Sequence, residues 1–225
     1  MLRNGVAALQ PLLLSVSMPK NPKTKRGREL FVLSRGSEGN FFPFLTEVPI
    51  EATHYFARGF HDAADTLTEK YSIGGDPDYA VLPVVFLFRH AAELYLKSII
   101  WNGDDLLKFL KKQDSGAGKT AFSSHSLKHL LPYAEKVASE FELEWDEDEC
   151  GTYNNAVRIM EQMDEEDPNS FAFRYPIDKG GKPVKHHQWG FDLESFALPT
   201  SKALNGWWDL ALGLEGVREQ YLMSH

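Results

Sequence analysis

The sequence contains a single cysteine, Cys150, among 225 residues. One cysteine excludes an internal disulfide and every zinc site built from several cysteines, and it favours a reducing compartment. No run of 18 apolar residues is present, so we expect no membrane-spanning helix. These two absences predict a cytoplasmic protein that has no membrane partner.

Several motifs of catalysis and nucleotide binding are absent or incomplete. The chain has no GxSxG, and the GAGKT at 116–120 lacks the first glycine of a P-loop, because Gln113 stands there. Ser126 follows His125, so the HExxH zinc pattern is absent as well. Cys150 lies in an acidic run that is expected to raise the pKa of its thiol. Nothing here supports Ser or Cys nucleophiles, and we expect no cofactor and no metal.

Acidic residues are absent from the first 28 positions, which hold six basic residues. The whole chain carries a net charge of −8, so subtracting +6 leaves −14 for residues 29–225. An acidic body disfavours nonspecific nucleic-acid binding, because Lys and Arg supply the affinity for phosphate. We expect residues 1–30 to form a disordered basic segment, either a solvated tail, which we favour, or an arm that touches nucleic acid.

Residues 1–17 have three interpretations. They form a weak secretory signal, a short transit-like segment, or a stretch that precedes a true start at Met18. We favour the last interpretation, because Gln10 and Pro11 interrupt the apolar run. Residues 31–225 show neither an internal repeat nor a clear boundary, so we expect them to form one domain.

The rest of the chain shows mainly the apolar periodicity of amphipathic helices. From Phe171 the pattern changes, so that 171–176 and 184–191 read as two strands around the turn 178–183. We therefore predict a mostly α fold: a helical bundle with one small β-hairpin inserted before the C-terminal helix. The predicted helices are Pro49–Tyr71, Val81–Trp101, Asp104–Lys112, His125–Phe141, Tyr153–Met163 and Thr200–Met223.

The helix Val81–Trp101 carries a charged stripe through an otherwise apolar segment. Arg89, His90, Glu93 and Lys97 fall on one face at helical spacing. Because Arg89–Glu93 and Glu93–Lys97 are i,i+4 pairs, the stripe can satisfy itself as an ion-pair ladder. The alternative is a polar pocket, to which Arg89 or His90 contributes together with Arg174. Arg and His together suit phosphate recognition and metal-independent RNA cleavage.

Two further clusters have weaker interpretations. His125 and His129 are four residues apart and would share a helix face, a spacing found in metal sites. No nearby acid completes such a site, and His186 and His187 would reach it only through long-range folding. Residues 140–149 hold seven acids, which we interpret as a solvated helix junction, because the EF-hand spacing and its glycine are missing.

The order of three segments resembles a known family. FLFRHAAELYLKSII at 86–100, HSLKHLL at 125–131 and FRYP at 173–176, which a glycine-rich turn follows, are together similar to bacterial HEPN-like proteins. The resemblance covers about residues 49–223. It implies an all-α bundle that forms a homodimer. It also implies a metal-independent endoribonuclease of a toxin–antitoxin or phage-defence system, with RNA and an antitoxin-like protein as partners.

Catalytic HEPN members carry an Arg that is followed, after a short spacer, by a His. Arg89 departs from this motif, because Leu94, Tyr95 and Leu96 stand where that His would fall. The literal match is Arg218 with His225, which six residues separate. The resemblance therefore names Arg218 and His225 as the catalytic pair. Arg89, His90, Glu93, His125, His129 and Arg174 are the candidate binding residues.

Two other functions compete with RNA cleavage. One is a non-catalytic helical dimerisation or interaction module, in which the hairpin and the helix of Trp207 and Trp208 form the partner surface. The other is a metal-dependent enzyme that uses His125 and His129.

Overall fold

A computed structural model describes residues 52–72, 77–175, 177, 180–182 and 192–223. Within these ranges the prediction of a mostly α fold is confirmed, because the chain forms helices and no strand. The segments 1–30 and 31–48 lie outside the described residues. The helices are α1 Thr53–Ser72, α2 Pro77–Phe109, α3 Thr120–Ser123, α4 Leu127–Glu140, α5 Glu147–Cys150, α6 Tyr153–Glu166 and α7 Leu193–Met223.

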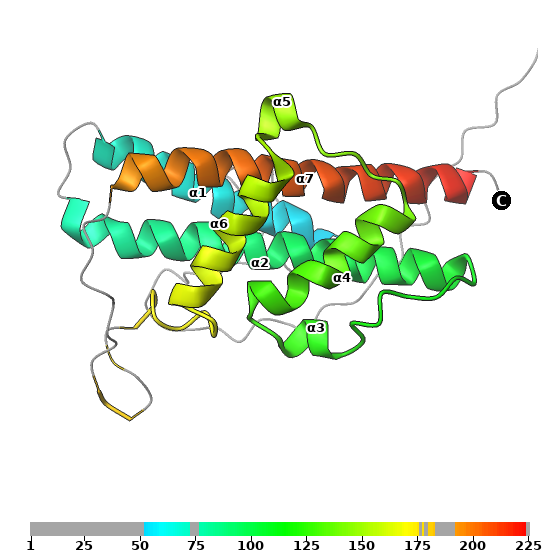
Figure 1. Cartoon of the computed structure of the whole chain (residues 1–225), viewed down its shortest axis with the longest axis horizontal. Coiled ribbons are helices and arrows are strands. Elements are labelled where there is room, and N and C mark those ends of the chain that lie inside the picture. The colour runs from blue at the N-terminus through cyan, green and yellow to red at the C-terminus, as the bar shows by residue number, and fades with distance from the viewer. Residues whose placement is uncertain (1–51, 73–76, 176, 178–179, 183–191, 224–225) are drawn as a thin grey trace, which may run out of the picture. The chain divides into compact units, whose positions relative to one another are not determined.

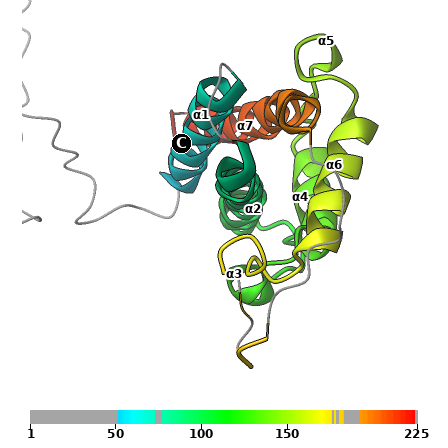
Figure 2. The same ribbon diagram turned by 90° about the vertical axis from the view of Figure 1, so that its left-hand side faces the viewer.

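Three long helices, α1, α2 and α7, lie side by side (Figure 1). α1 runs antiparallel to α7, since Tyr55 near its start meets Glu215 and His61 further along meets Ser201. α2 and α7 run in the same direction, as their colour gradients in Figure 1 show. A second pair of helices, α4 and α6, packs on the other side of α2 and α7 (Figure 2).

The core centres on α2. Of the 17 residues from Val84 to Ile100, 13 are buried and the other four are partly buried, which agrees with the long apolar run in its sequence. Trp207 of α7 is also fully buried, so it does not belong to the partner surface proposed for the Trp207–Trp208 helix. Its indole packs edge-on against Trp145, with 5.5 Å between the ring centroids.

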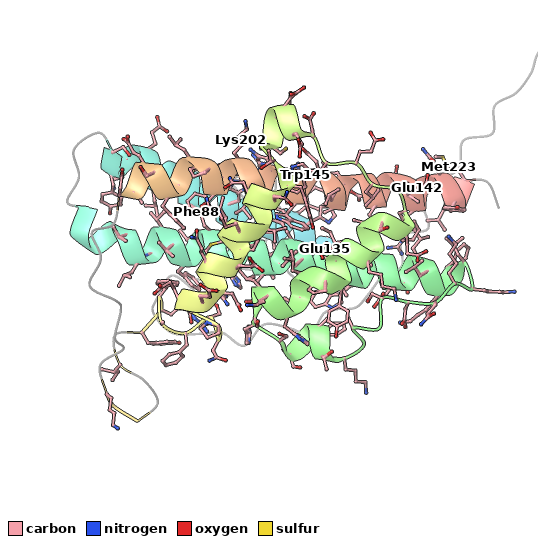
Figure 3. The ribbon with its side chains drawn as sticks, viewed as in Figure 1. Phe88, Glu135, Glu142, Trp145, Lys202 and Met223 are labelled. Carbon is pink, nitrogen blue, oxygen red and sulfur yellow. The ribbon has the colours of Figure 1, made fainter. Side chains whose placement is uncertain are left out.

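Two glycines allow the helices to approach closely. A β-carbon at Gly206 would overlap the indole of Trp145, which lies beside α7 (Figure 3). A β-carbon at Gly103 would overlap the side chain of Val137 on α4. Both glycines cost helix propensity, so their presence inside α7 and α2 is explained by this packing rather than by local preference.

The separate helix predicted at Asp104–Lys112 is wrong, because α2 continues without interruption to Phe109. Gly103 falls between the two predicted helices, but it lies inside α2 and allows the contact with α4 described above. Asp104 does not begin a helix. Its carboxylate accepts hydrogen bonds from the backbone N–H and the hydroxyl of Ser115, at 2.6 and 2.9 Å.

The first strand of the predicted hairpin is also wrong. Residues 171–174 form a turn, in which the N–H groups of Arg174 and Tyr175 donate to the carbonyl of Phe171 at 3.1 and 3.2 Å. The carboxylate of Asp167 accepts the N–H of Phe171 at 2.7 Å. These local partners use the backbone donors that a β-ladder would need. The return strand predicted at 184–191 lies outside the described residues.

Helix boundaries differ from the prediction where prolines and caps are concerned. α4 begins after Ser126, whose hydroxyl accepts the N–H of His129, and not after Ser124 as predicted. α4 continues through Pro132, which lies on the exposed side of the helix. Pro199 lies inside α7 rather than before it. No helix in the described part of the chain combines the length and hydrophobicity that crossing a membrane requires.

Candidate functional site

The charged stripe of α2 lies inside the protein. Arg89, Glu93 and Lys97 are only 0%, 2% and 5% exposed. One carboxylate oxygen of Glu93 accepts a hydrogen bond from Lys97 Nζ at 2.8 Å, and the other accepts one from Arg89 Nη1 at 3.5 Å. The predicted i,i+4 ladder is therefore present, and its burial makes each pair matter more than a surface ion pair would.

Arg89 extends this ladder to two other helices. Its Nη2 donates to the carbonyl of His125 at 2.7 Å and lies 3.6 Å from Asp164 Oδ1 on α6. Asp164 in turn accepts the hydroxyl of Ser126 at 2.9 Å and the N–H of Leu127 at 2.6 Å. Arg89 thus joins α2 to the start of α4 and the end of α6.

Burial lowers the pKa of Arg89, and the carboxylates of Asp167, Glu93 and Asp164 oppose that shift. An arginine stays protonated even so, because its ordinary pKa is so high. The guanidinium is therefore a permanent buried charge. It faces several carboxylates, which is the condition under which a buried ion cluster is tolerated.

His125 is the one member of this cluster whose side chain reaches the surface. Its Nδ1 lies 2.9 Å from Glu93 Oε1, and its side chain is 52% exposed, while that of Glu93 is 3% exposed. A carboxylate can only accept, so Nδ1 carries the proton and Nε2 is the basic nitrogen of the neutral ring. A buried carboxylate that orients an exposed imidazole is the arrangement of a general base.

The other candidate binding residues lie in different surroundings. His90 is partly buried between Phe60 and Phe86, whose ring centroids lie 4.5 and 5.6 Å away. The guanidinium of Arg174 lies 5.7 Å from the centre of the Phe86 ring, so Arg174 reaches the aromatic group around His90. His129 is exposed, and its ring packs edge-on against Tyr133.

Of the catalytic pair that the family resemblance implies, Arg218 lies within the described residues and His225 does not. Arg218 Nη2 lies 3.8 Å from Asp105 Oδ2, near the ends of α7 and α2. His225 lies outside the described residues, as do His186 and His187. In the described part of the chain, no group of three or more His, Cys, Asp or Glu side chains is arranged to hold a metal ion.

The pKa of the Cys150 thiol is raised, as predicted, but the neighbouring acids are not the main cause. Its sulfur lies 3.6 Å from Asp209 Oδ2. Burial and the charge of Asp209 raise the pKa of the thiol to about 11. A thiol with this pKa is protonated at neutral pH, which leaves it a poor nucleophile.

Sequence reasoning missed a second polar group, which lies between α1, α2 and α7. His61 is fully buried, with Nε2 2.9 Å from Ser201 Oγ and Nδ1 3.4 Å from the hydroxyl of Tyr95. Ser201 donates to Asp65 Oδ2 at 3.0 Å. Since Ser201 donates to Asp65, it accepts from Nε2–H, and Tyr95 donates to Nδ1. The spacing of His54, His61 and Asp65 on one face of α1 was the available signal.

Burial lowers the pKa of both His61 and His90 below the ordinary value of 6.5. As the pH falls below about 6.5, these two histidines therefore become protonated in the unfolded chain before they do so in the folded chain. We expect the free energy of unfolding to fall as the pH decreases from 7.5 to 5.5. The slope should reach at most about 1.4 kcal/mol per pH unit for each histidine.

Urea unfolding at several pH values between 7.5 and 5.5 measures this slope, and most carboxylates titrate below that range. His61→Gln should flatten the slope, whereas His129→Gln, which alters an exposed ring, should leave it unchanged. A free energy of unfolding that stays constant or rises toward pH 5.5 would contradict the assignment of His61 and His90 as neutral buried rings.

The charged cluster therefore combines a permanent buried framework with one exposed, oriented imidazole.

A comparison with protein-family models found no match for this chain, and comparisons with curated proteins and with solved structures found none either.

Proposed function

We propose that this chain is a HEPN-like protein that binds single-stranded RNA and cleaves it without a metal. The single observation that carries the proposal is the pair formed by His125 and Glu93, with 2.9 Å between Nδ1 and Oε1 and a half-exposed ring. RNA supplies a nucleophile of its own, the 2′-hydroxyl, so the protein needs only a proton acceptor and positive charge for the phosphate.

In the proposed reaction, Nε2 of His125 removes the proton of a 2′-hydroxyl. The 2′-oxygen bonds to the adjacent phosphorus, and the bond from phosphorus to the 5′-oxygen breaks. The departing 5′-oxygen takes a proton from the imidazolium or from water, and the products are a 2′,3′-cyclic phosphate and a 5′-hydroxyl. Glu93 stabilises the imidazolium that forms at His125, because its carboxylate is buried beside Nδ1.

The resemblance to HEPN-like proteins adds the biological setting to this proposal. It suggests a cytoplasmic homodimer in a toxin–antitoxin or phage-defence system, together with an antitoxin-like protein. The proposed chemistry differs in one respect from what the resemblance implies. The proposed proton acceptor is His125 and not the pair Arg218 and His225.

The test is cleavage of a fluorescently labelled single-stranded RNA in the presence of EDTA. We expect the wild-type protein to cleave it and His125→Ala to be at least about a hundredfold slower, as expected for loss of a general base. The control is Leu198→Ala, which shortens an exposed side chain on α7 and should keep the wild-type rate. DNA of the same sequence should survive, because it lacks the 2′-hydroxyl.

Two outcomes would overturn this assignment. Intact RNA after prolonged incubation with the wild-type protein would exclude the nuclease and favour the alternative, a non-catalytic dimerisation or interaction module. Cleavage that His125→Ala retains and that Arg218→Ala or His225→Ala abolishes would move the catalytic site to the C-terminal motif.

A further inference from the structure

Phe122, three residues before His125 in the sequence, presents an aromatic ring to solvent. Its residue surface is 53% exposed, although Phe is usually buried. The ring stacks on the indole of Trp101 of α2, with 4.4 Å between centroids and 18° between the planes. One face of the phenyl ring is therefore supported by the protein, and the exposure belongs to the remainder of the ring.

The backbone that carries this ring is held in place. Lys97 Nζ donates to the carbonyl of Phe122 at 3.4 Å, and the N–H of Ser124 donates to the carbonyl of Thr120 at 2.9 Å. The neighbouring Ala121 is fully buried and belongs to the hydrophobic core. A ring that is fixed before binding loses little conformational entropy when a ligand stacks on it.

Phe122 and His125 also belong to one connected group of atoms. The ammonium of Lys97 lies 3.4 Å from the Phe122 carbonyl and 2.8 Å from Glu93 Oε1, and that same carboxylate oxygen lies 2.9 Å from His125 Nδ1. The supported aromatic ring and the oriented imidazole are therefore attached to a common buried framework.

The charge of this segment differs from that of the whole chain. Residues 108–134 hold five lysines and a single acid, Asp114, in a chain whose net charge is −8. Lys119 and Lys128, which flank Phe122 and His125 in the sequence, are exposed. Lysines next to an exposed aromatic ring are the combination with which proteins bind single-stranded nucleic acids.

We propose that Phe122 is the stacking subsite for a base of single-stranded RNA, with Lys119 and Lys128 attracting the adjacent phosphates. The proposal rests on the function proposed above and adds to it the form in which the RNA is recognised. Stacking is sequence-tolerant, because every base has a π-face. We therefore expect unpaired RNA of mixed sequence to bind, and duplex RNA to bind more weakly.

The test measures fluorescence anisotropy with a labelled single-stranded adenine RNA and with an abasic RNA of the same number of phosphates. Phe122→Ala should weaken binding of the adenine RNA by roughly fivefold to a hundredfold, the range expected for one lost stacking contact. It should leave binding of the abasic RNA unchanged. Phe122→Trp should retain the wild-type affinity. Phe122→Leu, which keeps apolar cover on Trp101, should resemble Phe122→Ala.

The control variant is Phe109→Ala, which removes another exposed phenylalanine (57% exposed) at the end of α2 and should have no effect on binding. Equal affinities of Phe122→Ala and the wild-type protein for the adenine RNA would overturn the subsite. Equal weakening on the abasic RNA would also overturn it, because a lost fold or lost charge then explains the effect.

The two proposals fail separately. Binding that depends on Phe122 without any cleavage would support the stacking subsite and remove the nuclease. Cleavage that depends on His125, with no effect of Phe122→Ala on binding, would keep the nuclease and remove the subsite.

Discussion

Replacing Arg89 with Met should lower the free energy of unfolding by about 3–5 kcal/mol, the usual cost of removing one partner of a buried ion pair. Arg89 is fully buried and contacts Glu93 and Asp164. Met fills much of the same volume, so the expected loss comes mainly from carboxylates left without their cation. The hydrogen bond to the carbonyl of His125 disappears as well. Urea unfolding monitored by circular dichroism measures the change.

Arg158→Met is the matched control. Arg158 is exposed on α6, and its hydrogen bonds within the described residues go to Asn155 and Gln162 of the same helix, so its loss should cost within about 0.5 kcal/mol. Adding Asp164→Asn to Arg89→Met should restore part of the stability, because the amide removes an uncompensated charge but still accepts hydrogen bonds. A cost below about 1 kcal/mol for Arg89→Met would show that the cluster contributes little to the fold.

Trp207→Ala should destabilise the protein by about 3–5 kcal/mol, because it removes the largest fully buried side chain and leaves a cavity. The indole of Trp207 packs edge-on on Trp145 and lies 5.9 Å from the ring of Tyr153. It thereby links α7 to α6 and to the segment before α5. Trp207→Phe should lose less, since a ring remains and the buried indole N–H forms no hydrogen bond within the described residues.

Leu198→Ala provides the comparison on the same helix, because Leu198 is 68% exposed and its truncation should change stability by less than about 0.5 kcal/mol. The experiment also separates two interpretations of Trp207. A core residue changes the free energy of unfolding. A residue of a partner surface would leave the monomer's stability unchanged and alter the oligomeric state in light scattering.

The helical pattern and the charged stripe were predictable because both depend on near neighbours in the sequence. The i,i+4 spacing of Arg89, Glu93 and Lys97 alone places them on one face of a helix, and the structure contains those pairs. The predicted helix boundaries were wrong where tertiary packing overrides local sequence preference. Two separate helices are predicted on either side of Gly103, but this glycine lies inside α2 and allows Val137 to approach it.

The assembled candidate site was beyond local reasoning. His125 was a candidate, but nothing near it in the sequence indicates that its partner is Glu93, 32 residues earlier. Asp164 lies just beyond the predicted helix Tyr153–Met163, although in the structure it belongs to α6 and accepts hydrogen bonds from Ser126 and Leu127. Phe122 is not among the residues that the sequence singles out, because its support by Trp101 arises only when α3 packs on α2.

By itself, the sequence determined that the chain is mostly helical and that one helix carries a charged stripe whose members pair at i,i+4 spacing. Periodicity and neighbouring charges act over a few residues, so they can be read directly. The tertiary structure alone decided which buried charges meet, which histidine reaches the surface and which aromatic ring remains exposed. A buried polar group must find a partner, but only the packing of distant helices determines which group that partner is.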